Sequence, residues 1–406
     1  MTSTVNRSLT VLIGATLTMT LALGLRQSFG LYLIPITQTF GWSRETFSLA
    51  IALQMLLAGV AQPLAGSLSD RYGSGRMVSL AAVGFSISLL LMSLSTTPAT
   101  FILTAGILAG LSMGGMGTSV VLGAVGRATV ESKRSMYFGI VTAGGSLGMF
   151  LLLPLGHFFI SNFGWVTALI ITGLLCLTII PMGQLLTEPS SPTSGDRPSP
   201  LRALRAAGQE TRFWLLVAGF FVCGFHVSFI ATHLPAYLSD KGIASSIGAS
   251  ALSLIGLFNI FGSFTFGYLG NHFSKKYTLC WLYLSRSIII SLFIMLPISN
   301  LSVLIFGATM GFIWLGTIPL TSGLVGQMFG MRYLGALYGI VFLGHQLGSF
   351  LGVWLGGFVF DITGSYDIIW WAAIGLGIAS SLIHLPINEL QKTDLDLPRV
   401  DSITVK

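Results

Sequence analysis

Charged side chains are scarce in this sequence of 406 residues: Asp, Glu, Lys and Arg together make up 8% of it, whereas 53% of the residues are hydrophobic. A soluble protein of this size needs far more charge to cover its surface. The 50 glycines would be unusual in a soluble helical protein, but small residues let helices pack closely in a bilayer. The composition therefore predicts an integral membrane protein whose surface is largely covered by lipid.

Cysteine is also scarce, and the three present, Cys176, Cys223 and Cys280, all lie inside apolar runs. An odd number of such cysteines argues against a disulfide framework and favours small buried side chains. The net charge of +7 is dispersed between apolar segments rather than gathered on one face, so we expect no nucleic-acid partner. The first apolar stretch is too long for a signal peptide and lacks a cleavage site, so we expect it to be retained.

Apolar runs of about 20 residues or more, the length that crosses a bilayer, recur along the whole chain. We expect twelve transmembrane helices, near residues 10–36, 47–69, 77–96, 100–126, 135–160, 165–187, 213–238, 246–270, 277–297, 301–328, 334–361 and 367–386. The segment between the sixth and seventh runs is polar and rich in proline, as expected of a linker. The sequence thus predicts an all-α membrane protein with an N-terminal six-helix half at 1–187, a cytoplasmic linker at 188–212, a C-terminal six-helix half at 213–390 and a cytoplasmic tail at 391–406.

The distribution of basic residues predicts the orientation, because Lys and Arg are retained on the cytoplasmic side of a membrane. With the N-terminus inside, 16 of the 20 basic residues fall on the cytoplasmic side, and only Arg44 and Lys241 fall outside. The remaining two, Arg26 and Arg286, lie within helices. We therefore expect a multi-pass protein of the bacterial inner membrane with both termini in the cytoplasm.

The sequence also repeats itself at an offset near 200 residues. Residues 24–35 match 224–235, and residues 139–150 match 339–350. Because an even number of crossings separates the copies, they have parallel topology, related by a pseudo-two-fold axis along the membrane normal. The first and seventh helices, and the fifth and eleventh, are therefore expected to be symmetry mates.

The loop after the second run reads Gly66-Ser-Leu-Ser-Asp70-Arg71-Tyr-Gly73-Ser-Gly-Arg76. It resembles the signature of the major facilitator superfamily, and together with twelve spans and a central linker the resemblance covers essentially the whole chain. An acidic residue and basic residues at helix ends can pair in one conformation and separate in another. We expect such a conformational latch here, with a decayed copy at 267–276, formed by Gly66, Asp70, Arg71, Gly73, Arg76, Asn271 and Lys275.

Within the superfamily, residues 28–35 and 40–44 are similar to the start of bacterial monocarboxylate and oxalate/formate carriers. Gly106, however, stands in the fourth helix where proton-coupled drug antiporters have an arginine. The eighth run, 246–270, contains no charge, although carriers of the monocarboxylate group place an arginine there. These departures weaken both the exporter and the monocarboxylate assignments.

No acidic residue falls within the expected membrane core, which contains two arginines and several histidines. Arg26 lies 16 residues into the first run, near the middle of the bilayer, where a charge is costly and faces a cavity or a partner. The resemblance implies that this helix lines the central cavity. Arg26 is thus a candidate anchor for an anionic substrate, since its planar fork suits a carboxylate or phosphate. The alternative is that Arg26 binds backbone carbonyls and supports packing.

Arg286 also lies inside a span, but the resemblance places the ninth helix at the periphery, so we expect a structural or gating role. His226 occupies the symmetry position of Arg26, and His233 lies on the same face about 10 Å further along the helix. That separation is too large for a mononuclear metal site. Each histidine is therefore either a hydrogen-bonded core residue or a contributor to anion binding or proton transfer.

Polar side chains elsewhere in the spans are further candidates for substrate binding. His345 and Gln346 stand where the first half has Gly145 and Ser146, so the two halves differ there as expected for the recognition of an asymmetric ligand. Four more residues are expected to add hydrogen bonds or a wall to the site, namely Tyr32, Gln54, Asn259 and Trp314.

The sequence therefore favours a transporter that moves a small organic anion by alternating access about a site near the midplane. Symport of a proton, simple facilitation and exchange stay open. The alternatives are proton-coupled efflux of amphipathic compounds and a transport-derived sensor. We expect neither an enzyme, because no nucleophile and base or metal cluster is present, nor a cofactor. The expected partners are the solute and the lipid bilayer, and the protein is expected to be monomeric.

Overall fold

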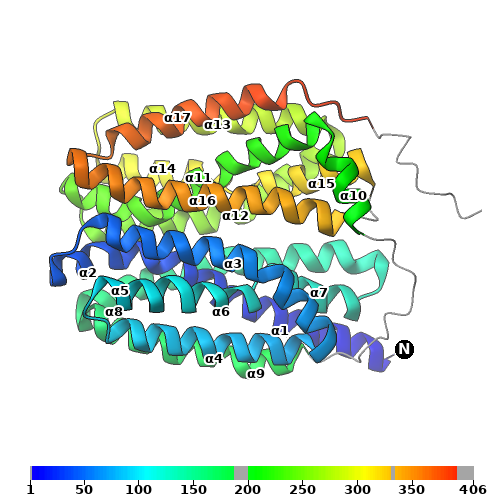
Figure 1. Cartoon of the computed structure of the whole chain (residues 1–406), viewed down its shortest axis with the longest axis horizontal. Helices are drawn as coiled ribbons and strands as arrows, with labels where there is room; N and C mark the ends of the chain where they lie inside the picture. Colours follow the sequence, from blue (N-terminus) through cyan, green and yellow to red (C-terminus); the bar gives the residue numbers. More distant parts are fainter. Residues whose placement is uncertain (1, 187–199, 331–333, 391–406) are drawn as a thin grey trace, which may run out of the picture.

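The computed structural model describes residues 2–186, 200–330 and 334–390, and its regular structure there is entirely helical. Figure 1 shows long helices running roughly parallel to one another, with the early helices grouped in the lower part of the view and the later ones in the upper part. The expected tail at 391–406, Arg332 and residues 188–199 of the expected linker lie outside the described residues. The described part of the linker contains a short helix that begins at Pro200.

The first group of helices starts near the N-terminus and continues to residue 184. In chain order these elements are α1 (Thr2–Gln27), η1 (Ser28–Tyr32), α2 (Leu33–Phe40), α3 (Arg44–Tyr72), α4 (Ser74–Ser93), α5 (Pro98–Phe101), η2 (Ile102–Leu108), α6 (Ala109–Gly115), α7 (Thr118–Ala128), α8 (Glu131–Leu177) and α9 (Ile179–Gln184). Gly73, with φ 96°, forms the tight turn between α3 and α4, a conformation that residues with a Cβ rarely adopt. This explains a glycine in the signature segment.

The second group follows the linker. Its elements are α10 (Pro200–Gly208), α11 (Thr211–Asp240), α12 (Ser245–His272), α13 (Lys275–Met295), α14 (Asn300–Phe312), α15 (Thr317–Phe329), α16 (Leu334–Thr363) and α17 (Asp367–His384). The expected fourth and tenth spans are each interrupted, since α6 ends before α7 at Met116–Gly117, and α14 ends before α15 at residues 313–316. At the second interruption, backbone groups of residues 313–315 bond to side chains.

Within the described residues, eleven helical segments are long and apolar enough to cross a membrane. The expected fifth and sixth spans lie together in one of them, Met136–Gln184. At 1.5 Å per residue its 49 residues would extend about 70 Å, far beyond the roughly 30 Å of a hydrocarbon core. Gly164 interrupts it with φ 78° and ψ 162°, so two helices meet there.

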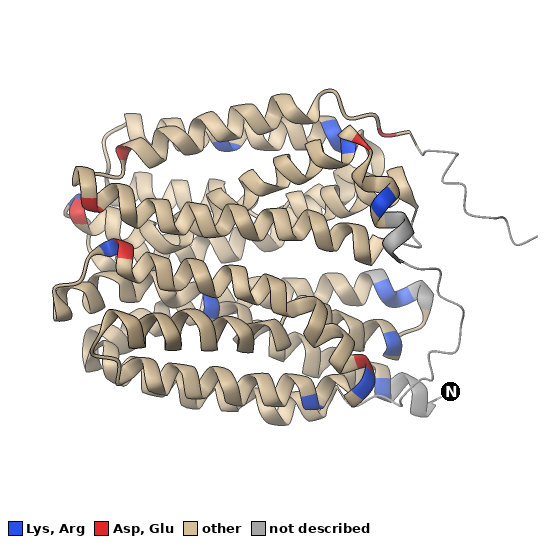
Figure 2. Cartoon of the chain, viewed as in Figure 1, with Lys and Arg blue, Asp and Glu red and all other residues tan. Residues whose placement is uncertain are grey.

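Charged residues gather at the two ends of the helices, and little charge lies between them (Figure 2). We call the end with the α2–α3 turn the Arg44 end, and the end with α10 and the α3–α4 turn the linker end. Large apolar side chains are exposed along the outside, for example Leu80, Phe264 and Ile305. Such a surface suits lipid, and the cost of a charge in lipid explains why most charges lie at the ends.

The main contacts between the two groups of helices are those of α3 with α16, of α8 with α12, and of η1 and α2 with α11. We call the two groups the first and second halves of the molecule. A Cβ at Gly30 in η1 would clash with the carbonyl oxygen of Ala231 in α11. Glycine at this position therefore permits the close approach of the two backbones.

Candidate functional site

Arg26 lies in the last turn of α1 and is half-buried. Its Nε and Nη2 atoms lie 3.2 Å and 2.8 Å from Sδ of Met55 in α3. A thioether sulfur is a weak, uncharged acceptor. No described residue forms an ion pair with Arg26, so its positive charge is held in the bundle without a neutralising partner.

Met55 also connects Arg26 to the other half of the molecule. The carbonyl oxygen of Met55 accepts a hydrogen bond from Nε2 of Gln346 in α16, at 2.5 Å. Oε1 of Gln346 lies 3.2 Å from Nδ1 of His345, and that nitrogen lies 3.5 Å from Oγ of Ser349. The structure thus brings Arg26, Gln346 and His345 together through a methionine that sequence reasoning did not single out.

Arg286 in α13 is fully buried, yet its surroundings differ from those of Arg26. Its Nη2 donates to the carbonyl oxygens of Ile313, at 2.8 Å, and of Trp314. These carbonyls end α14, where unpaired C=O groups carry partial negative charge. Arg286 therefore caps the interruption between α14 and α15, while its Nε and Nη1 have no hydrogen-bond partner among the described residues.

Asn259 in α12 supports the same interruption from the other side. Its Oδ1 accepts from the backbone N–H of Leu315, at 3.0 Å, and its Nδ2 donates to Oγ of Ser146 in α8, at 2.8 Å. Asn259 is fully buried, as is Trp314, which lies in the interruption itself. These contacts join the halves and hold the broken helix.

The two histidines of α11 that were expected in the site are buried and bond within the second half. His226 Nε2 lies 2.7 Å from the carbonyl oxygen of Ala373. Both ring nitrogens of His233 have partners, Tyr366 Oη at 3.1 Å and the carbonyl oxygen of Val353 at 2.8 Å. None of the described hydrogen bonds connects these histidines to Arg26, which suits packing roles.

The remaining two candidates also contact neighbours in the first half. Tyr32 Oη lies 3.4 Å from Oγ1 of Thr172, and Gln54 Nε2 donates to the carbonyl oxygen of Ala105, at 2.9 Å. Both side chains are fully or almost fully buried. Oε1 of Gln54 has no hydrogen-bond partner in the described part of the chain.

The signature segment forms an ion pair within the first half. Asp70 Oδ1 accepts from Nη1 of Arg127, at 2.5 Å, and Nη2 of Arg127 donates to Ser74 at 2.6 Å. Sequence reasoning named Asp70 but not this partner. In the second half, Lys275 Nζ donates to the neutral Oε1 of Gln327, at 2.9 Å, whereas Asn271 and Arg76 are exposed at the linker end.

A charged cluster at the Arg44 end joins the halves, and sequence reasoning missed it. The Arg44 guanidinium makes two bonds of 2.7 Å to the carboxylate of Asp240 and a third, of 3.0 Å, to Tyr366 Oη. It also lies 3.6 Å above the ring of Phe360. Asp361 accepts from the backbone N–H groups of Arg44 and Glu45 at the start of α3, at 3.0 Å and 2.7 Å.

The cluster is extended by Glu45, whose Oε1 accepts from the indole N–H of Trp354 in α16, at 3.1 Å. The first half thus contributes the start of α3, and the second half contributes α11, α16 and the segment before α17. The sequence marked Arg44 only as a basic residue outside the membrane, because nothing in a linear pattern shows which helix ends meet.

Comparison with known families settles what kind of protein this is. The model of the Major Facilitator Superfamily matches residues 12–322. The chain belongs to this superfamily. Like other major facilitators, it is a transporter and not an enzyme.

Among similar major facilitators, the uncharacterized MFS-type transporter YcxA of Bacillus subtilis (strain 168) is 27% identical over 383 residues, covering 90% of this chain and 92% of that one. Monocarboxylate transporter 13 of Bos taurus is 23% identical, covering 90% and 86%. A bacterial homologue of the human lysosomal transporter Spinster, solved in an inward-facing and occupied conformation, superposes with a TM-score of 0.70 at 16% identity, covering 92% of each chain. That structural likeness supports the fold.

Proposed function

We propose that this major facilitator moves a small organic anion, of the carboxylate class, and that Arg26 is its principal anchor. The observation that carries the proposal is the guanidinium of Arg26, half-buried in the bundle and bonded to an uncharged thioether. A buried cation without a counter-ion is costly. A carboxylate would satisfy it with two charge-assisted hydrogen bonds, which a thioether cannot provide.

The relatives support the carboxylate class. Two transporters with detectable similarity over most of this chain carry the name monocarboxylate transporter. The uncharged eighth span of this chain lacks the arginine expected in that group, so Arg26 in the first span would supply the cation from a different helix. His345 and Gln346, which connect to Arg26 through Met55, would then contact the rest of the solute.

We further propose twelve crossings, with Gly164 as the turn between the fifth and sixth, and two six-helix halves related by pseudo-two-fold symmetry. The linker end would be cytoplasmic, in agreement with the excess of basic residues there. Arg44 and Lys241 would then face the opposite side, which is the periplasm in a bacterial inner membrane.

Transport would follow alternating access, with the two halves rocking about the site. The Arg44 cluster would close the periplasmic end, because it ties the halves together through an ion pair, a hydrogen bond to Tyr366 and two caps from Asp361. Opening that end requires these contacts to break. The substrate would therefore leave or enter through the linker end in the conformation described.

Binding titrations on monodisperse protein test the anchor, using a series of small mono- and dicarboxylates together with uncharged amide analogues. Arg26→Gln removes two charge-assisted bonds of about 1.5–3 kcal/mol each, so affinity should fall about 100-fold or more. Arg26→Lys keeps the charge but loses the planar fork, so its anion affinity should lie between those of the parent protein and Arg26→Gln. Arg205→Gln, an exposed arginine of α10, is the matched control.

An uncharged analogue should be nearly indifferent to Arg26→Gln. Unchanged anion affinity in this variant would refute the anchor and direct attention to His345 and Gln346. Uptake into liposomes, with and without a pH gradient, separates the remaining alternatives: an organic-anion carrier accumulates or exchanges the anion, whereas a proton-coupled exporter extrudes amphipathic compounds.

A further inference from the structure

An open pocket of about 580 Å³ lies at the Arg44 end, between the ends of α11, α13 and α17. It is lined by Tyr237 and Lys241 at the end of α11, Ile294 and Ile298 at and beyond the end of α13, and Asp367 and Trp371 at the start of α17. Its volume is within the range of small-molecule sites, about 300–1,000 Å³. No residue of the Arg26 network lines it, so it is a separate site.

The pocket presents one charge of each sign. Lys241 and Asp367 both line it, and within the described residues neither makes an ion pair. Nζ of Lys241 lies 5.7 Å from the ring centroid of Tyr237. The residue next to Lys241, Asp240, forms an ion pair with Arg44. Charged residues at this end can therefore form ion pairs, whereas the two in the pocket make none among the described residues.

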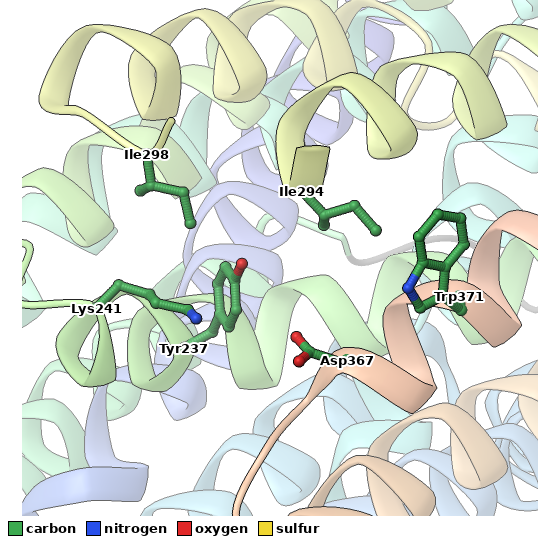
Figure 3. A pocket seen from close by; sticks show the side chains of 6 residues that line it. All are labelled: Tyr237, Lys241, Ile294, Ile298, Asp367 and Trp371. Carbon is green, nitrogen blue, oxygen red and sulfur yellow. The ribbon is translucent and has the colours of Figure 1, made fainter. Parts of the chain in front are cut away.

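Figure 3 shows how the pocket is arranged: the ammonium of Lys241 and the carboxylate of Asp367 lie on either side of the Tyr237 ring, Ile294 and Ile298 face them, and Trp371 closes one side. Trp371 is 55% exposed, and Met295 and Leu296, next to the apolar wall, are 70% and 55% exposed. Exposed tryptophan and apolar side chains at a span end lie at the level of lipid headgroups. The pocket therefore opens where a lipid can enter it.

We propose that this pocket binds the headgroup of a zwitterionic aminophospholipid of the ethanolamine type, from the leaflet at the Arg44 end. The Lys241 ammonium would bind the phosphate, and the Asp367 carboxylate would accept hydrogen bonds from the lipid ammonium. The glycerol and first acyl carbons would lie on the isoleucines and Trp371. A headgroup with negative charge alone would meet Asp367 unfavourably, and a choline headgroup has no N–H to donate to it.

Thermal melting of the purified full-length protein in detergent micelles, doped with increasing amounts of lipid, tests this site. The probes are phosphatidylethanolamine, phosphatidylcholine and phosphatidylglycerol with identical acyl chains. Phosphatidylethanolamine should raise the melting temperature at about tenfold lower concentration than the other two. Native mass spectrometry should retain it preferentially as a bound lipid.

Two variants test separately the contacts with the phosphate and with the ammonium of the headgroup. Lys241→Gln should weaken binding of phosphatidylethanolamine about tenfold, and Asp367→Asn should remove the preference for it over phosphatidylcholine. Lys133→Gln, an exposed cation of α8 at the linker end, should change neither. Equal stabilisation by all three lipids in the parent protein, or a preference that survives in both pocket variants, would overturn the proposal.

Binding of soluble glycerophosphoethanolamine shows whether the ligand is a lipid or a dissolved zwitterion. If the lipid is the ligand, the soluble headgroup should bind at least about 100-fold more weakly, because it lacks the carbons that contact Ile294, Ile298 and Trp371. Equal affinity for the soluble compound would show that the pocket takes a dissolved zwitterion, and it would refute the lipid assignment.

Discussion

Arg26 and Arg286 are the same residue type inside the same kind of apolar helix, but the structure surrounds them differently. Arg286 is fully buried and donates to two carbonyl oxygens that end α14. Arg26 is half-buried and, among the described residues, bonds only to the thioether of Met55. The comparison shows that a cation in a membrane protein cannot be given a role from its position alone. The partners of Arg286 identify it as a residue that caps a broken helix, whereas the uncharged partner of Arg26 supports the proposal that this arginine binds a ligand.

The largest expected effect concerns stability, and it should appear at Arg286 alone. Arg286→Gln leaves two buried carbonyls without their charged donor, and each unsatisfied group costs about 1–3 kcal/mol. The free energy of unfolding should therefore fall by about 2–6 kcal/mol, seen as a lower melting temperature and a smaller monodisperse fraction. Arg26→Gln, as the matched control, should melt close to the parent protein. Equal melting of both variants and the parent would show that Arg286 does not support the broken helix.

A second prediction compares the two ends of the molecule. Arg44→Gln and Asp240→Asn each break the ion pair that joins the halves at the Arg44 end. Because Asp240 is one-third exposed, with 34% of its side chain accessible, we discount the pair to about 1 kcal/mol. The conformational equilibrium should then move about fivefold toward opening at that end.

Spin labels at Gln38 and Ser239, exposed residues of opposite halves, measure this shift as a change in the distance distribution. The double variant should differ little from either single one, since the first change already removes the interaction. Identical distributions in the parent and all variants would mean that the Arg44 cluster does not hold this end closed.

The apolar helices and the signature segment could be predicted from the sequence because hydropathy and local turn chemistry depend on neighbouring residues, whereas the count of twelve crossings stays a prediction. Gly73 and Gly164 illustrate this, since each forms a turn with positive φ between two apolar runs. The contact between Arg44 and Asp240 could not be predicted, because it joins residues that are 196 positions apart. The role of Met55 was hidden for the same reason. A methionine in an apolar helix looks like packing until the helix facing it is known.

A third, smaller effect is expected at the latch. Asp70 and Arg127 are 50% and 32% exposed, and surface ion pairs contribute about 0–1 kcal/mol. Asp70→Asn should therefore slow uptake by no more than about fivefold and leave substrate affinity unchanged, because it acts on the conformational equilibrium. Lys275→Gln, which breaks a bond to the neutral Gln327, should have less effect. Initial uptake rates in liposomes and binding titrations measure the rate and the affinity of each variant. Equal uptake rates in Asp70→Asn and the parent protein would contradict the latch role.

The smallest expected effect concerns Met55, whose thioether is the partner that distinguishes Arg26 from Arg286. Met55→Leu conserves volume, which buried sites tolerate well, and it keeps the backbone carbonyl that Gln346 binds. It removes only the sulfur that lies 2.8 Å from Nη2 of Arg26. If that weak bond competes with the substrate carboxylate for the fork, anion affinity should rise about two- to threefold, as expected for an acceptor as weak as a thioether. The measurement is the same binding titration used for Arg26→Gln, with melting temperature recorded to confirm intact packing. A fall in affinity comparable to that of Arg26→Gln would contradict this competition and would instead make Met55 the residue that holds the fork in its binding position.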